Sequence, residues 1–262
     1  MHYKMENRLL NRTIISALLL FVITVVSRGQ DSQVTGFKSG SELYSQGKYS
    51  EALDIWMNLY NSGIRSADLD YNIANAYFKL NNIPGSVLFY ERALLLNPLD
   101  EDSRYNLQIA RTLVVDKFVD IPELFFVTWF NFVSLMLSSD LWAVISIVSF
   151  IIFLLLISLY IYSGKYRSKV LGFWLGLAML LISAISISFS FRNRSLVFNN
   201  KDAIIFSPVI NGKSSPDESG TDLFVIHEGT KVTIEDTVGT WYEIRLSDGN
   251  KGWVPSDCLS KL

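Results

Sequence analysis

The pattern of hydrophobic and polar residues changes several times along the chain. Residues 14–26 form a short apolar run, whereas residues 141–163 and 170–191 form two longer runs without a charged side chain. Between the short run and the first long one, small and large apolar residues alternate as in packed helices. After residue 201, short β-branched and aromatic runs alternate with turn residues. The pattern therefore predicts helices, then two long apolar helices, and finally a small stranded domain.

The two long runs predict a transmembrane helical hairpin over residues 141–191. Each has about 20 residues, the length that a helix needs to cross the hydrocarbon core of a bilayer. The loop between them contains Lys165, Arg167 and Lys169, and the chain before the hairpin is acidic. Because positively charged short loops stay in the cytoplasm, we expect both flanking domains to face the periplasm from the cytoplasmic (inner) membrane. The two arginines that follow the second run weaken this asymmetry without reversing it.

Two further segments are interpreted through their relation to the membrane. In residues 1–29, the basic residues Lys4, Arg8 and Arg12 precede the short apolar run, which is the order of a secretory signal peptide. An uncleaved anchor is the alternative, and it would leave the next domain on the same side. Residues 116–140 are predicted to be an interfacial linker, because the Phe-rich segment 124–137 is too short and broken for a third span. Trp129 and Trp142 would then lie at the level of the lipid head groups.

The chain contains an internal repeat. Residues 33–66 align with residues 67–100 without a gap. At several of the aligned positions, a small residue matches a small residue or an aromatic residue matches an aromatic residue. Small residues let antiparallel helices approach closely, and large residues fill the space between helix pairs. A third copy begins at Glu101 and ends near Val115, as a capping helix would. An ordinary pair of helical hairpins is the alternative explanation. The aligned positions include Gly40 with Ala74, Ala52 with Ser86, and Trp56 with Tyr90.

The 34-residue period, with residues 71–77, 90–94 and the pair Asn97 and Pro98, resembles the tetratricopeptide repeat family. This resemblance implies an α-helical solenoid over residues 33–115, whose stacked helix pairs leave a concave groove that holds another polypeptide.

The resemblance also implies which residues line that groove. Asn75 and Asn106 resemble asparagines that hold a peptide backbone in some members of the family. Phe37 and Tyr71 occupy the basic positions of a carboxylate clamp, so the groove is expected to prefer an apolar or aromatic segment. Packing between helices is the competing role for Tyr71 and Phe78. The predicted groove residues are Phe37, Tyr44, Tyr71, Asn75, Phe78, Lys79, Tyr105 and Asn106.

Residues 201–262 predict a small all-β barrel with five short strands. The segments 228–232, 241–244 and 248–255, in which an Asp-Gly turn precedes a Gly-Trp-Val strand, resemble bacterial SH3-like domains. Such domains bind cell wall, peptides or other parts of their own chain. Residues 211–220 contain mostly turn formers and predict a flexible loop. The candidate ligand face consists of Trp241, Tyr242 and Trp253, for which burial in the core is the alternative.

Composition argues against several classes of function. Lysine and arginine number 23 and aspartate and glutamate 25, so no basic field attracts nucleic acid. Cys258 and two histidines, His2 and His227, provide neither a zinc site nor a plausible nucleophile and base. Paired carboxylates such as Asp68 and Asp70 stand at predicted helix starts, where the helix dipole favours them. We therefore expect no enzyme activity, catalytic residue, metal site or cofactor.

The predicted order is signal peptide, repeats, membrane hairpin and SH3-like barrel. It resembles the E component (BatE) of the Bacteroides aerotolerance operon. That resemblance implies a membrane complex with other exported or membrane proteins, including von Willebrand A-type Bat proteins, and a contribution to oxidative-stress resistance. We therefore expect two kinds of partner, membrane lipid and another exported or membrane protein, and we expect the role of a scaffold. The alternative is a peptidoglycan-binding or sensing protein that acts through the SH3-like domain.

Overall fold

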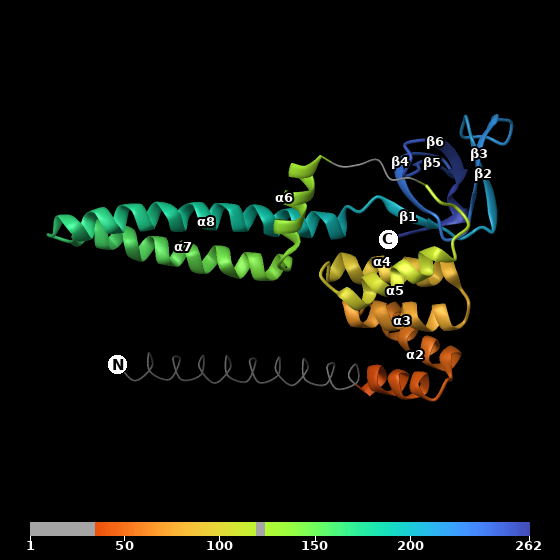
Figure 1. The fold of residues 1–262 in the computed structure, drawn as a ribbon, viewed down its shortest axis with the longest axis horizontal. Helices are drawn as coiled ribbons and strands as arrows, with labels where there is room; N and C mark the ends of the chain where they lie inside the picture. The colour runs from red at the N-terminus through yellow and green to blue at the C-terminus, as the bar shows by residue number, and fades with distance from the viewer. Residues whose placement is uncertain (1–34, 119–123) are drawn as a thin grey trace, which may run out of the picture.

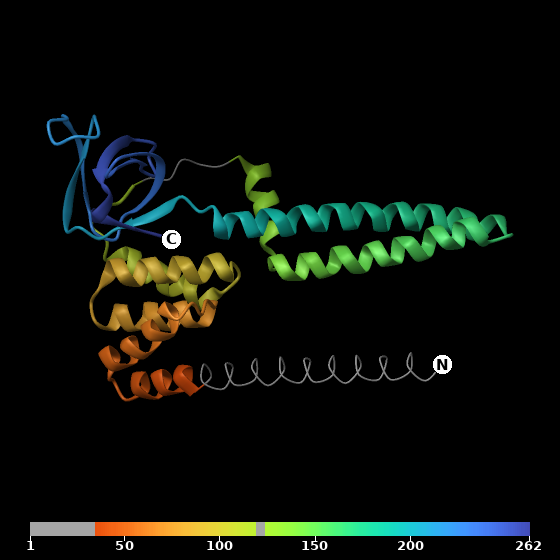
Figure 2. The ribbon, with the colours of Figure 1, turned by 180° about the vertical axis from the view of Figure 1, so that it is seen from behind.

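The computed structural model describes residues 35–118 and 124–262, so the predicted signal peptide lies outside the described residues. The chain forms a head and a long helical hairpin that projects from one side of it (Figure 1). Within the head, a stack of short helices lies against a curled β-sheet, and the view from behind shows the same two layers (Figure 2). The last strand ends at the boundary between these layers.

The helical layer consists of two antiparallel hairpins and one further helix. A helix over residues 35–45 precedes α2 (Tyr49–Asn61), and α3 (Ala67–Lys79) pairs with α4 (Ile83–Leu96) before α5 (Glu101–Thr112). The sequence marks several of the starts, because Ser66, Asn82 and Asp100 cap α3, α4 and α5 by accepting a hydrogen bond from a backbone N–H. A helix, α5, stands where the capping helix is predicted, and it ends at Thr112 rather than near Val115.

Close helix contacts occur at the small residues of the repeat. A Cβ atom at Gly40 would lie 2.3 Å from Nε1 of Trp56, so only glycine fits beneath that indole ring. The same Nε1 donates a hydrogen bond to the carbonyl oxygen of Phe37 at 3.3 Å. Ala52 and Ala74 are fully buried in the same core. The predicted alternation of small and large residues is therefore the packing that the helices use.

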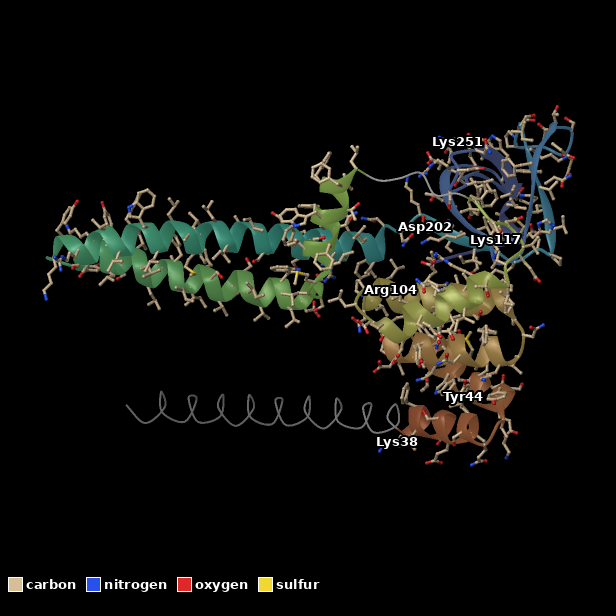
Figure 3. The ribbon with its side chains drawn as sticks, in the orientation of Figure 1. Lys38, Tyr44, Arg104, Lys117, Asp202 and Lys251 are labelled. Atoms are coloured by element: carbon tan, nitrogen blue, oxygen red, sulfur yellow. The ribbon has the colours of Figure 1, made fainter. Side chains whose placement is uncertain are left out.

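The two long apolar runs form the hairpin of α7 (Ser139–Tyr162) and α8 (Tyr166–Phe198). Both helices are long and apolar enough to cross a membrane. Their large apolar side chains point outward along most of their length, unlike those of a buried core helix (Figure 3). The seam between them uses small residues: Ser146 and Ser183 exchange hydrogen bonds at 3.0 Å, and Gly172 lies against the backbone of α7.

Helix α8 continues seven residues past the predicted end at Phe191, because its polar side chains find partners there. Arg192 donates to the side chains of Ser134 and Asn131 at 2.6 and 2.5 Å. These acceptors belong to α6 (Phe125–Leu135), which lies across α8 at the base of the hairpin (Figure 1). Nε1 of Trp142 also donates to the carbonyl oxygen of Ser134, at 2.8 Å. The Phe-rich linker segment is thus one short helix, oriented across the hairpin.

The β layer is one antiparallel sheet with seven strands in the order β3-β2-β6-β5-β4-β1-β7. The prediction of five strands missed β2 and β7. It was also wrong for residues 211–213, which belong to β2 rather than to a flexible loop. Gly212 is needed there because a Cβ would lie 2.2 Å from the ring of Phe224. The strands are β1 (Asp202–Ile205), β2 (Val209–Lys213), β3 (Asp222–His227), β4 (Lys231–Val238), β5 (Trp241–Arg245), β6 (Lys251–Pro255) and β7 (Leu259–Lys261).

Candidate functional site

The helical layer contains a groove of about 330 Å³ on the side of α3 and α5. Six of the eight predicted groove residues line it, together with Tyr90 and Ile109. Phe37 does not line this groove, because it packs beside the buried core. Tyr105 is outside it as well and is 65% exposed on α5. The predicted residues that the structure brings together are Tyr44, Tyr71, Asn75, Phe78, Lys79 and Asn106.

A hydrogen-bond network fixes the polar groups at the centre of this groove. The hydroxyl of Tyr90 donates to Oδ1 of Asn75 at 2.5 Å, and Nδ2 of Asn106 donates to the same oxygen at 3.1 Å. Asn106 also donates to the hydroxyl of Tyr71 at 3.2 Å. Burial raises the pKa of Tyr90, so its hydroxyl stays protonated and remains a donor.

This network leaves two groups unused. Within the described residues, Nδ2 of Asn75 and Oδ1 of Asn106 have no hydrogen-bond partner. One is a donor and the other an acceptor, and their orientation is set by the bonds that the opposite ends of the two amides make. A polypeptide backbone offers the matching pair, an acceptor carbonyl and a donor N–H. The groove therefore carries neutral, pre-oriented groups of the kind that bind an extended chain.

The walls of the groove are mainly aromatic. Tyr44 contacts Tyr49 and Trp56 with ring centroids 5.0 and 5.8 Å apart, while Phe78 packs against the core from its half-buried position. Tyr71 and Phe78 thus both pack between helices and line the groove. Lys79, at the exposed end of α3, is the charged residue among those that line it. Apolar side chains of a bound segment would find contact area here without a strong charge requirement.

A second polar cluster joins the helices to the sheet. Glu91 on α4 is buried and forms ion pairs with Arg111 and with Lys231, the latter at 2.9 Å. Lys231 also reaches Asp202 at 3.1 Å. Burial lowers the pKa of Lys231, but the two carboxylates outweigh it and raise the pKa above its usual value. Every charge in this cluster therefore has an opposite charge beside it. Asp202 is the first residue of β1, the strand that contacts α4, and Figure 3 shows it at this boundary.

The segment after α5 attaches to the sheet through Asp116. Its carboxylate accepts hydrogen bonds from Thr230 Oγ1 at 2.6 Å and from the backbone N–H of His227 at 2.7 Å. It also lies 2.9 Å from Nδ1 of the His227 ring. Burial raises the pKa of Asp116, but these hydrogen bonds outweigh it and leave the pKa below the usual value. His227 thus has a structural partner 111 residues away in the sequence, which sequence patterns could not reveal.

The three residues predicted to form a ligand face do not lie on the same surface of the sheet. Trp241 and Trp253 alternate with buried Ile244 and Val254 along β5 and β6, so they lie on the outer surface. Both are half-buried and neither belongs to the apolar core of the sheet. Tyr242 is on the other surface, packs beside that core and has the Lys261 ammonium 4.6 Å from its ring centroid. Of the three predicted residues, the two tryptophans therefore share the outer surface of the sheet.

The remaining candidates for chemistry have structural roles. In the parts of the chain that the structure describes, no group of three or more His, Cys, Asp or Glu residues is arranged to hold a metal ion. Cys258 is buried as predicted, and its thiol donates to the carbonyl oxygen of Pro255 at 2.9 Å. Burial raises its pKa to about 11, so the reactive thiolate is disfavoured at neutral pH.

Comparison with known proteins identifies part of the chain. Residues 213–260 match the family described as bacterial SH3 domain, which covers the sheet from the end of β2 to β7. No curated protein matches the chain. The family match agrees with the antiparallel sheet and with the resemblance found in the sequence, and it concerns this domain alone.

Proposed function

We propose that this protein is a membrane-anchored scaffold whose helical layer holds an extended segment of another exported or membrane protein. The observation that carries the proposal is the pair of unused amide groups on Asn75 and Asn106, fixed by their own hydrogen bonds inside an aromatic groove. The helices would be tetratricopeptide repeats, as the 34-residue period and the helix pairs indicate.

The length and the exposed apolar side chains of α7 and α8 support the anchoring part of this proposal. In water, two helices with so many exposed apolar side chains would be costly, whereas a bilayer would cover them. The positively charged loop between them would face the cytoplasm, and the head would face the periplasm. Helix α6 would then lie in the plane of the membrane surface, which suits its exposed Phe and Trp side chains.

The partner that best suits the groove is an extended, apolar or aromatic segment of a membrane protein. We infer that the two proteins belong to a Bat-type complex, in which the partner carries a von Willebrand A-type domain, and that the complex serves aerotolerance. This step rests on the order of repeats, membrane hairpin and C-terminal SH3-like domain. The protein would contribute binding and positioning to the complex, since the described residues show only structural roles for its thiol and histidine.

Replacing Asn75 with Asp tests the groove with almost no change of shape. Aspartate keeps the oxygen that accepts from Tyr90 and Asn106, but it replaces the free N–H donor by an acceptor. We expect capture of the partner from crosslinked membranes to fall about tenfold, because one hydrogen bond is lost and a backbone carbonyl is repelled. The matched control is Gln108→Glu, which adds the same charge at an exposed position on α5 outside the groove.

Equal capture by Asn75→Asp and the wild-type chain would mean that the groove is not the binding site. Thermal unfolding should be measured for each variant, so that a loss of capture can be assigned to the groove rather than to the fold. Capture reduced equally by both variants would indicate a general charge effect instead.

The second candidate function is binding of peptidoglycan through the SH3-like domain. The family match and the outer position of Trp241 and Trp253 favour it, because aromatic faces offer flat apolar surfaces to sugars and peptides. The full chain in detergent should then sediment with purified peptidoglycan. Replacing both tryptophans with Ala should abolish this sedimentation, and failure of the wild-type chain to sediment would exclude the function.

A further inference from the structure

Another cleft lies beside the end of α8 and is lined by residues of α3, α4 and α8. It has a volume of about 300 Å³, and an adjoining cleft of about 470 Å³ continues toward the start of α7. The two clefts share four lining residues and so form one path with an apolar middle. The shared residues are Leu95, Leu96, Val197 and Phe198. No role in partner binding has been assigned to this path.

The end of the path nearest the helices contains an unusual carboxylate. Asp70, in the first turn of α3, is only 1% exposed, and its Oδ1 has no hydrogen-bond partner among the described residues. A buried carboxylate normally accepts hydrogen bonds, because an unpaired one loses the hydrogen bonds that water would otherwise donate to it. Burial raises its pKa to about 6, although Arg92 and Arg65 act in the opposite direction. Asp70 nevertheless forms no ion pair within 4 Å of either arginine in the described chain.

Two arginines line the same cleft. Arg65 lies over the ring of Tyr60 at 3.5 Å and uses Nη1 for two backbone carbonyls. Arg92 lies near the same ring and donates from Nη2 to the carbonyl oxygen of Lys261 at 2.5 Å. Their remaining guanidinium N–H groups have no partner among the described residues, so both retain donors suited to a phosphate. The cleft thus combines donors for an anion with one acceptor for a cation.

The position of the cleft indicates where such a ligand comes from. Val197 lies six residues beyond Phe191, the last residue of the uncharged run, which corresponds to about 9 Å along the helix. The head-group layer on each side of a bilayer is roughly 5–7 Å thick. The cleft therefore adjoins the outer edge of that layer if α7 and α8 span the membrane, and its apolar middle leads back toward the hydrocarbon.

We propose that this cleft binds the head group of a lipid of the phosphatidylethanolamine type, with the phosphate at Arg65 and Arg92 and the ammonium at Asp70. The acyl chains would follow Val197 and Phe198 toward the start of α7. A purely anionic lipid would place its phosphate beside Asp70 without a compensating cation. Phosphatidylcholine has no N–H to donate to Oδ1 of Asp70. This inference rests on the proposed insertion of the hairpin in the membrane.

The test is native mass spectrometry of the full chain released from nanodiscs that contain equal amounts of phosphatidylethanolamine, phosphatidylglycerol and phosphatidylcholine. We expect phosphatidylethanolamine to be retained about tenfold more than either competitor, as one charge-assisted hydrogen bond allows. Asp70→Asn, which keeps the side-chain volume, should abolish this preference. Arg65→Gln should lower retention of all three lipids, whereas Arg104→Gln, an exposed arginine outside the cleft, should change nothing.

Equal retention of the three lipids, or a preference that survives Asp70→Asn, would overturn the lipid site. Circular dichroism of each variant separates a lost site from a lost fold. A chain that fails to enter nanodiscs would overturn both the membrane anchoring and the lipid site. A chain that enters them without lipid preference would overturn the lipid site alone, since capture of a partner by the groove does not involve Asp70.

Discussion

Tyr90 and Glu91 are neighbours on α4, yet they belong to two different kinds of surface. Tyr90 points into the groove, where the amides of Asn75 and Asn106 retain a free donor and a free acceptor. Glu91 faces the sheet and pairs with Lys231 of β4 as well as with Arg111 of α5. Polar groups that satisfy one another hold two parts of one chain together, whereas pre-oriented groups left without partners are available to a ligand.

The largest effect on stability should come from a change at the surface of α4 that faces the sheet, where Glu91 has its ion pairs. Glu91→Gln removes a buried charge and leaves Arg111 and Lys231 without it, so the free energy of unfolding should fall by about 3 kcal/mol. Chemical denaturation of the full chain in detergent measures this loss. Partner capture should be unchanged at temperatures where the variant is folded, and a selective loss of capture would break the distinction between the two surfaces.

Asp70 sharpens the comparison because it is buried and its Oδ1 has no hydrogen-bond partner within residues 35–118 and 124–262. Its pKa of about 6 in the folded chain lies above the usual 3.8, so the folded state binds the proton more tightly than the unfolded state. Stability should therefore decrease as pH rises from about 4 to 6 and stay lower above it. Asp70→Asn should raise the free energy of unfolding by about 2 kcal/mol at pH 7, and by little at pH 4. Unfolding curves at both pH values, recorded without added lipid, check this; a destabilised variant at pH 7 would contradict it.

A change at Asp116 is expected to have a smaller effect on the free energy of unfolding, with a dependence on pH opposite to that of Asp70. Its folded pKa is lowered, so its stabilising contribution is present above the unfolded pKa near 4 and is lost as pH falls through the folded pKa. Asp116→Asn should cost about 1 kcal/mol at pH 7, because the amide accepts fewer hydrogen bonds from Thr230 and His227. Acid titration of stability should show a shallower loss below pH 4 in the variant. Identical acid titrations of the two chains would show that Asp116 does not fasten the helices to the sheet.

The smallest effect should occur at Tyr105, which the sequence places in the groove and the structure leaves exposed on α5. Tyr105→Ala should change the free energy of unfolding by less than about 0.5 kcal/mol and partner capture by less than twofold. Quantitative capture beside Asn75→Asp provides the direct contrast. A loss at Tyr105 as large as that at Asn75 would mean that the bound segment extends well beyond the groove.

Local patterns in the sequence predict much of this fold. The apolar runs predict α7 and α8, because an uncharged stretch of that length is typical of a membrane-spanning helix. Small residues such as Gly40 predict where helices approach one another closely. Residues 211–213 show the limit of such patterns. Their composition is typical of a turn, but Gly212 is required in β2 by the ring of Phe224 on the next strand.

The polar sites were less predictable, since their partners are distant in the chain. The resemblance to tetratricopeptide repeats implies six of the residues that line the groove. Asp70 looks like an ordinary residue of a helix start until α4 and α8 are placed beside it. Likewise, only the folded chain brings His227 to Asp116. Sequence periodicity identifies which face a residue lies on, but it cannot show what that face meets.

The most direct test of the proposed scaffold is site-specific photocrosslinking in intact membranes. A photoreactive residue at position 78 lies in the groove, and one at position 251 lies on the exposed side of the sheet. We predict that position 78, unlike position 251, gives a discrete adduct, which mass spectrometry maps to one apolar or aromatic segment of an exported or membrane protein. Asn75→Asp should lower the yield of this adduct about tenfold. An adduct from position 251 and none from position 78 would contradict the proposal and move the binding site to the SH3-like domain.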